Sequence, residues 1–142
     1  MGVFQSSTPL TEFDRESMST QGGVKYEGYW ANSEDEKSNF PFPVGSDTAW
    51  PGKDEFLTKL RRKQSSAEET SYRGMSHCRL VGKHNCQPDS GFDDQPVKDN
   101  GSSEFSITSP NGDLITWPEG YAHYVEVHNV KPSREFYNFI MN

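Results

Sequence analysis

Cysteine and histidine side chains occur in two segments of the chain and could together bind a metal ion. One segment contains Cys78, His84 and Cys86, and the other contains His123 and His128. Thiolate and imidazole are common zinc ligands in proteins, and four such ligands complete the tetrahedral shell of a structural zinc ion. The residue types therefore predict a zinc site formed by Cys78, Cys86, His123 and His128, with His84 as a substitute ligand.

The spacing of these residues fits a zinc module only in part. The His-x4-His interval lies in the range that zinc fingers use, and a predicted hairpin precedes it. Val81, however, occupies the position where a Cys-x2-Cys pair starting at Cys78 would need its second thiol. On a regular helix, residues five apart also project about 140° from each other. We therefore expect His123 and His128 to converge on one ion only if the helix loosens.

The two histidines also fit a structure without metal. A helix over residues 118–129 would place His128 on its apolar face and His123 on the opposite, wetter face. A histidine on a buried face is commonly satisfied by a hydrogen bond within the core. The sequence leaves both interpretations open. The apolar face would consist of Tyr121, Tyr124, Val125 and His128.

Catalytic motifs are incomplete. A small metal-dependent hydrolase that uses His123, Glu126 and His128 is the alternative function, but the spacing matches neither His-Glu-x-x-His nor His-x-x-Glu-His. His77 stands beside Cys78, yet neighbours on a strand point to opposite faces, so His77 could not activate that thiol directly. We assign no catalytic residue and favour a non-enzymatic protein.

The helices and strands that must position the cysteines and histidines are expected to form an α+β fold. The Asn-Gly step at residues 111–112 lies between two apolar runs and supplies the positive φ angles of a hairpin turn. The fold we expect is a small antiparallel sheet of about three strands, including a hairpin over residues 104–117, packed with about three helices. The other expected elements are strands near residues 24–30 and 72–82 and helices near residues 50–64, 118–129 and 133–140.

Composition predicts one ordered domain with irregular flanks. Residues 1–21 are rich in Ser, Thr and Glu without periodicity, so we expect a disordered or loosely attached segment. Residues 22–142 form the single α+β domain. Within it, residues 83–103 are rich in Asp, Gly and Pro. So long an irregular connection is uncommon in a compact domain, so we expect a mobile loop there or, alternatively, a functional one.

Charge and hydropathy limit the classes of partner. The 142-residue chain carries a net charge of −7, which opposes binding to nucleic acid phosphates. It lacks an apolar stretch near the roughly 20 residues that a membrane span needs. We expect a soluble, cytoplasmic monomer that acts through a protein partner. The Met1-Gly2 start with Ser6 fits an N-myristoylation pattern, but no basic segment nearby supplies a second anchor.

Aromatic residues beside prolines are the candidates for contact with that partner. Residues 40–43 read Phe-Pro-Phe-Pro, and this pattern enforces extended backbone. The segment would lie across the domain as a strap that covers the core or, alternatively, as a ligand for a partner. The contact residues, if they are not buried, are Trp30, Trp50, Phe40 and Phe42.

Two sequence signatures carry a resemblance. Residues 72–79 read Tyr-Arg-Gly-Met-Ser-His-Cys-Arg, and residues 117–128 read Trp-Pro-Glu-Gly-Tyr-Ala-His-Tyr-Val-Glu-Val-His. Over residues 50–140 the chain resembles a group of small uncharacterised proteins with both signatures, similar to a degenerate Cys/His zinc-binding module. That group has a Cys-x2-Cys-Gly, whose second thiol is absent here. The resemblance implies no activity. It implies zinc ligation by Cys78, His123 and His128, with Cys86 or His84 as the fourth ligand.

Overall fold

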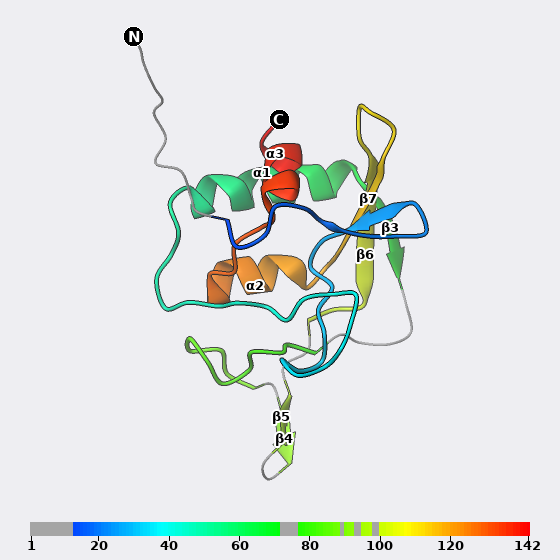
Figure 1. Cartoon of the computed structure of the whole chain (residues 1–142). Helices are drawn as coiled ribbons and strands as arrows, with labels where there is room; N and C mark the ends of the chain where they lie inside the picture. The colour runs from blue at the N-terminus through cyan, green and yellow to red at the C-terminus, as the bar shows by residue number, and fades with distance from the viewer. Residues whose placement is uncertain (1–12, 72–76, 89, 93–94, 98–99) are drawn as a thin grey trace.

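The computed structural model describes residues 13–71, 77–88, 90–92, 95–97 and 100–142. In these residues a five-stranded sheet stands beside three helices, α1 (Lys53–Ser66), α2 (Tyr121–His128) and α3 (Arg134–Met141) (Figure 1). The α+β class and the number of helices are as predicted. None of the described helices is long and apolar enough to cross a membrane.

The sheet is larger than expected and is mixed. Its strands, in spatial order, are β1 (Ser19–Gln21), β2 (Val24–Tyr26), β7 (Leu114–Pro118), β6 (Ser103–Thr108) and β3 (Glu68–Ser71). Strand β2 pairs with β7 in parallel, whereas the other pairs are antiparallel. The expectation of about three strands was therefore wrong. Five strands form the main sheet, and two others form a separate sheet. The two strands of this separate sheet are β4 (Ser90–Phe92) and β5 (Gln95–Val97).

The predicted hairpin is confirmed as β6 and β7. The two strands pair from Glu104 opposite Pro118 to Thr108 opposite Leu114. Their connection is a turn in which the Gly112 amide donates to the Ser109 carbonyl at 2.9 Å. Gly112 has a φ of 93°, which explains why this position requires glycine.

The predicted strand over residues 72–82 is not found in its described part. Residues 72–76 lie outside the described residues, and a single bridge at His77 is followed by turns from Arg79 to Gly82. The amide of Lys83 donates to the carbonyl of Leu80 at 3.1 Å, so the chain reverses direction here. The expected mobile loop over residues 83–103 contains the two-stranded sheet in its described part.

The core is built mainly from aromatic rings between the sheet and the helices. Phe136 of α3 lies at its centre, 5.5 Å from Trp117 of β7, 5.4 Å from Tyr121 of α2 and 6.2 Å from Phe56 of α1 between ring centroids. All four residues have 0% exposure. Aromatic rings therefore supply much of the burial in a chain with few aliphatic residues.

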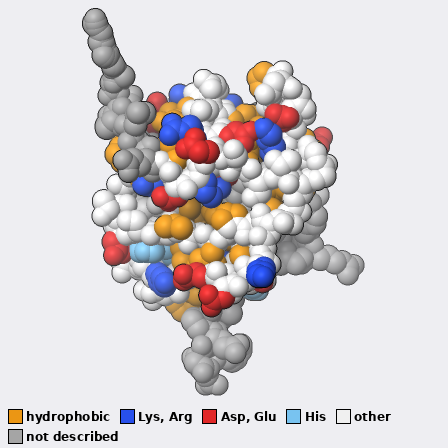
Figure 2. Space-filling model, viewed as in Figure 1, with side chains coloured by type: hydrophobic (Ala, Val, Ile, Leu, Met, Phe, Trp, Pro, Cys, Tyr) orange, Lys and Arg blue, Asp and Glu red, His pale blue; other side chains and the backbone are white. Residues whose placement is uncertain are grey.

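The two tryptophans expected at a partner surface belong to this core. Trp30 is 8% exposed and Trp50 is 5% exposed, and the Trp50 indole donates to the Val130 carbonyl at 3.3 Å. Phe40 and Phe42 are half-buried. On the face seen in Figure 2, acidic and basic side chains alternate and hydrophobic side chains show between them.

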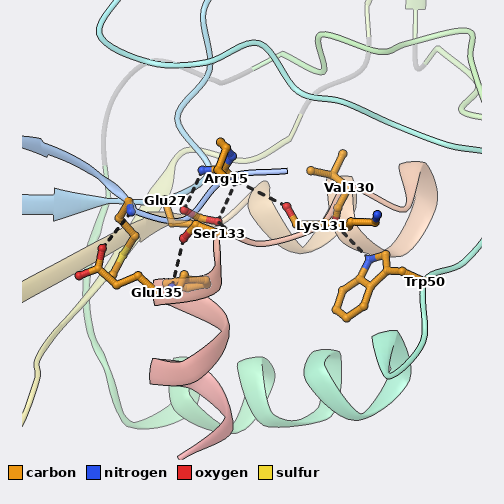
Figure 3. Close-up of polar contacts among 9 residues, drawn as sticks. Arg15, Glu27, Trp50, Val130, Lys131, Ser133 and Glu135 are labelled. Carbon is orange, nitrogen blue, oxygen red and sulfur yellow. Dashed lines mark hydrogen bonds and ion pairs between the residues drawn. The ribbon is translucent and has the colours of Figure 1, made fainter. Parts of the chain in front are cut away.

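The described residues 13–21 of the N-terminal segment are hydrogen-bonded to α3, and residues 1–12, the rest of the segment expected to be disordered or loosely attached, lie outside the described residues. The guanidinium of Arg15 donates to both carboxylate oxygens of Glu27, at 3.2 and 3.0 Å (Figure 3). Glu27 is 1% exposed and also accepts from the amide of Ser133 at 2.7 Å. The carbonyl of Arg15 in turn accepts from the amide of Arg134, the first residue of α3.

Candidate metal centre

The two cysteines of the candidate site lie at the ends of a short turn, residues 78–86. The amide of Gly82 donates to the carbonyl of Cys86 at 2.8 Å and closes this turn. His84 and Asn85 adopt positive φ angles of 55° and 66°, which bend the backbone back on itself. The turn brings Cys86 beside Cys78.

Helix α2 supplies the two histidines, and Tyr124 fastens the cysteine turn to this helix. The Tyr124 hydroxyl accepts from the amide of Arg79 at 2.7 Å and donates to the carbonyl of His77 at 3.4 Å. The Tyr124 ring packs against Trp30 with the centroids 5.5 Å apart. The residues on both sides of Cys78 are thus hydrogen-bonded to α2, which sets the position of its thiol.

The structure brings Cys78, Cys86, His123 and His128 together. One potential ligand atom from each residue lies within 4.8 Å of the other three. The Sγ atom of Cys78 is 3.3 Å from Nε2 of His128, and the Sγ atom of Cys86 is 3.5 Å from Nε2 of His123. Tetrahedral zinc with usual bond lengths separates neighbouring ligand atoms by roughly 3.3 to 3.8 Å. A small contraction would therefore enclose a metal ion.

Burial favours the neutral forms of Cys78 and His128 when no ion is bound. Cys78 and Cys86 are free thiols with 5% and 3% exposure, and His128 has 0% exposure. Burial raises the pKa of Cys78 to about 11. Burial, followed by the neighbouring His123 and His84 rings, lowers the pKa of His128 to about 4. His128 thus already has the neutral form that a metal requires, whereas a bound cation would have to displace the thiol protons.

The end of helix α2 is wider than that of a regular α-helix. The helix continues to His128, but the amides of Asn129 and Val130 both donate to the Tyr124 carbonyl, five and six residues earlier instead of the regular four. Asn129 ends the helix with a φ of 54°. At this widened end the imidazole rings of His123 and His128 lie 5.1 Å apart.

The predicted helix face is confirmed, although it did not decide between a core histidine and a ligand. His128 is buried and His123 is half-buried, as expected from the apolar stripe. The buried residues of α2 are Tyr121, Tyr124, Val125 and His128. Burial and proximity to thiols are compatible, because His128 lies at the end of the helix next to Cys78.

Glu126 lies outside the cluster. Its side chain is exposed, and its carboxylate pairs with Arg61 of α1 at 3.3 Å. His123, Glu126 and His128 therefore do not converge as the hydrolase hypothesis requires. Cys86 supplies the second thiol of the cluster, which a Cys-x2-Cys pair would have placed at position 81. His84 lies beside the cluster, with its Nδ1 atom 2.8 Å from Nδ1 of His128.

A segment that the sequence did not identify also borders the site. The amide of Ser46 donates to the carbonyl of His128 at 2.8 Å, and the Asn129 side chain donates to the Ser46 carbonyl at 2.9 Å. The Asp47 carboxylate lies 3.9 Å from Nε2 of His84. Apart from turn-forming residue types, residues 45–47 carry no motif that predicts contact with the site.

Comparison with known proteins shows the family of the chain. The profile of a family described as "Domain of unknown function (DUF7919)" matches residues 42–141. The search of curated proteins and the search of solved structures each found no match. The matched range contains all four residues of the cluster and the three helices. Because the match covers more than half of the sequence, the chain belongs to the DUF7919 family of domains of unknown function.

Proposed function

We propose that this protein is a non-enzymatic domain that a structural zinc ion stabilises. The observation that carries the proposal is the convergence of two thiols and two imidazoles within 4.8 Å. Two sulfur and two nitrogen donors form a ligand set typical of structural zinc sites, and thiolates select zinc over hard cations such as magnesium or calcium. The ligands would be Cys78, Cys86, His123 and His128.

The arrangement supports a structural role better than a catalytic one. Four protein ligands fill a tetrahedral shell, whereas catalytic zinc keeps one position open for water or substrate. Three of the four residues are buried, so bulk water would have little access to an ion. In addition, Glu126 is bonded to Arg61 and cannot act as a base at the cluster from that position.

Zinc would also fasten a segment that has no regular secondary structure. Residues 78–86 form turns, and the core receives Leu80 and the two cysteines from them, with Val81 packed against it. An ion would join both ends of this turn to α2, so part of its binding free energy would stabilise the folded state. Such a contribution suits a chain with only 31% hydrophobic residues.

We further infer that the domain acts through a protein partner. An open cleft of about 340 Å³ is lined by the aromatic residues Tyr29, Trp30 and Phe40, with Arg79 at its wall. Aromatic and arginine side chains are the residues that most often dominate protein interfaces. A photoreactive side chain at position 40 should crosslink to a bound partner, and the same group at the exposed Val44 should not. Equal crosslinking at both positions would contradict this surface.

The metal content of the purified protein tests the zinc site. We expect one equivalent of zinc in the wild type by elemental analysis, and loss of this zinc in Cys78→Ser and in His128→Ala. His77→Ala is the matched control, because it removes an imidazole outside the cluster and should retain the ion. Zinc below about a tenth of an equivalent in the wild type would end the proposal.

A further inference from the structure

The two ring nitrogens of His128 face two different side chains. Nε2 lies 3.3 Å from the Cys78 thiol, and Nδ1 lies 2.8 Å from Nδ1 of His84. We propose that His84 is a positioning residue of the zinc site, which holds the ring of His128 in the orientation and tautomer that ligate through Nε2. This inference rests on the proposed zinc site and assigns a role to a residue outside the four ligands.

The hydrogen bond between the two histidines has only one arrangement when His128 ligates a metal. Ligation uses the lone pair of Nε2, so the neutral ring must carry its proton on Nδ1. That N–H then donates to His84, whose Nδ1 must be the unprotonated acceptor. Metal-bound histidines usually donate their second N–H in this way, and the acceptor fixes the ring and raises its basicity.

The backbone of His84 supports a role for its side chain. His84 has a φ of 55°, in the left-handed region that glycine and asparagine adopt at lower cost. This conformation costs free energy, which the contacts of the residue with its surroundings offset. The interaction that the structure shows is the contact with His128, together with the carboxylate of Asp47 at 3.9 Å.

The segment 45–47 holds the outer side of this histidine pair. Ser46 donates its amide to the carbonyl of His128, so the segment is fixed to the end of α2. Gly45 leaves room for the imidazole, because a Cβ at this position would lie 2.7 Å from Cε1 of His84. The Asp47 carboxylate faces Nε2 of His84, the nitrogen that carries the proton when Nδ1 is the acceptor. The space at Gly45 favours this placement of the His84 ring, and the Asp47 carboxylate favours this tautomer.

Two substitutions of His84 distinguish the effect of its hydrogen-bond acceptor from the effect of its backbone conformation. His84→Gly and His84→Asn both tolerate a positive φ, but only asparagine offers an oxygen near the place of Nδ1. Zinc affinity is measured by competition with a chelator on the full chain. We expect His84→Gly to bind one equivalent of zinc about 10- to 100-fold more weakly than the wild type. His84→Asn should recover most of the affinity, and His77→Ala should equal the wild type.

Nitrogen-15 NMR of the imidazoles supplies a readout that a purely structural role would not change. In the zinc-bound wild type, we expect the proton of His128 on Nδ1 and that of His84 on Nε2. The proposal is overturned if His84→Gly binds zinc as tightly as the wild type, or if His84→Asn binds as weakly as His84→Gly. It is also overturned if the spectra show a nitrogen of His84 bound to zinc. Absence of zinc in the wild type would refute the proposed function itself, before any variant is compared.

Discussion

The Arg15–Glu27 network and the Cys/His cluster both join distant parts of the chain to the C-terminal helices. In the network, Arg15 and Glu27 meet at the start of α3, where Ser133 donates its amide to the same carboxylate. In the cluster, the turn of residues 78–86 meets α2. The network balances a buried carboxylate with a cation and hydrogen bonds. The cluster instead brings two thiols and two imidazoles together, with sulfur–nitrogen distances of 3.3 and 3.5 Å.

This difference indicates that the two regions depend on different conditions. A buried ion pair with its hydrogen bonds satisfied needs no further component, although the loss of one partner is costly. Four soft donor groups around one point are weak partners for one another and become strongly bound only around a cation. We therefore expect the network to stabilise the fold with or without metal, and the cluster to do so only with metal.

The largest effect is expected from Glu27→Ala. The change leaves Arg15, whose side chain is 23% exposed, without its carboxylate partner. The free energy of unfolding should fall by about 3–5 kcal/mol, by the same amount with zinc and with a chelator. Denaturant unfolding under both conditions measures it. The control Glu16→Ala removes an exposed partner of Arg134 and should cost less than about 1 kcal/mol. A loss for Glu27→Ala that vanished in chelator would contradict the separation of the two regions.

The next largest effect is the increase in the free energy of unfolding that zinc binding causes. Free zinc at a thousand times its dissociation constant should raise the free energy of unfolding of the wild type by about 4 kcal/mol. Cys78→Ser should show no such increase, because it removes a ligand. Thermal or denaturant unfolding with buffered zinc measures both proteins. An equal increase in the variant would place the zinc elsewhere.

A smaller effect should appear as acid sensitivity of the metal-free protein. The folded state holds the pKa of His128 at about 4, below its ordinary value of 6.5, so the unfolded chain binds more protons between these values. The metal-free fold therefore keeps its full stability above pH 6.5 and loses roughly 2–3 kcal/mol as the pH falls toward 4, because protonation of His128 favours the unfolded chain. Unfolding of the chelator-treated protein from pH 7 to 4 measures this slope.

Two variants test whether the pH dependence of the free energy of unfolding comes from His128. His128→Gln should flatten the dependence, since glutamine does not titrate. His77→Ala should keep it, because His77 lies outside the buried cluster. If the slope were unchanged in His128→Gln, its source would lie outside the cluster.

The smallest effect is expected in the network at the start of α3. The Ser133 hydroxyl accepts from the Phe136 amide at 3.1 Å and caps the helix. Ser133→Ala should cost about 1 kcal/mol in the free energy of unfolding, equally with zinc and chelator. Ser65→Ala is the control, because its exposed hydroxyl bonds only a carbonyl within α1. A zinc-dependent cost for Ser133→Ala would mean that the two regions are coupled.

The sequence predicted those helices and strands whose ends are marked by turn-forming or helix-capping residues. The Asn-Gly step marked the β6–β7 hairpin, and Ser133 marked the start of α3, where it accepts the expected hydrogen bond. Strand β3 has no such signal, because all four of its residues are exposed and polar, and its apolar alternation is absent. The parallel pairing of β2 with β7 joins residues about 90 positions apart, a contact that no local pattern encodes.

The candidate site was predictable in its residue types but not in its assembly. Metal chemistry identified the two thiols and two imidazoles, and the helical stripe identified the buried side of His128. Their convergence depends on positive φ angles at His84 and Asn85, where neither residue type requires them. Arg15 and Glu27 gave no signal at all, because a charged pair in a polar segment is most often exposed.

X-ray absorption at the zinc edge of the purified wild-type protein tests the central claim most directly. The spectrum counts the sulfur and nitrogen neighbours of the metal without any substitution. We predict two sulfur neighbours at about 2.3 Å and two nitrogen neighbours at about 2.0 Å, for one zinc ion per chain. A shell of nitrogen and oxygen alone, or protein that binds no stoichiometric zinc, would contradict a structural centre formed by Cys78, Cys86, His123 and His128.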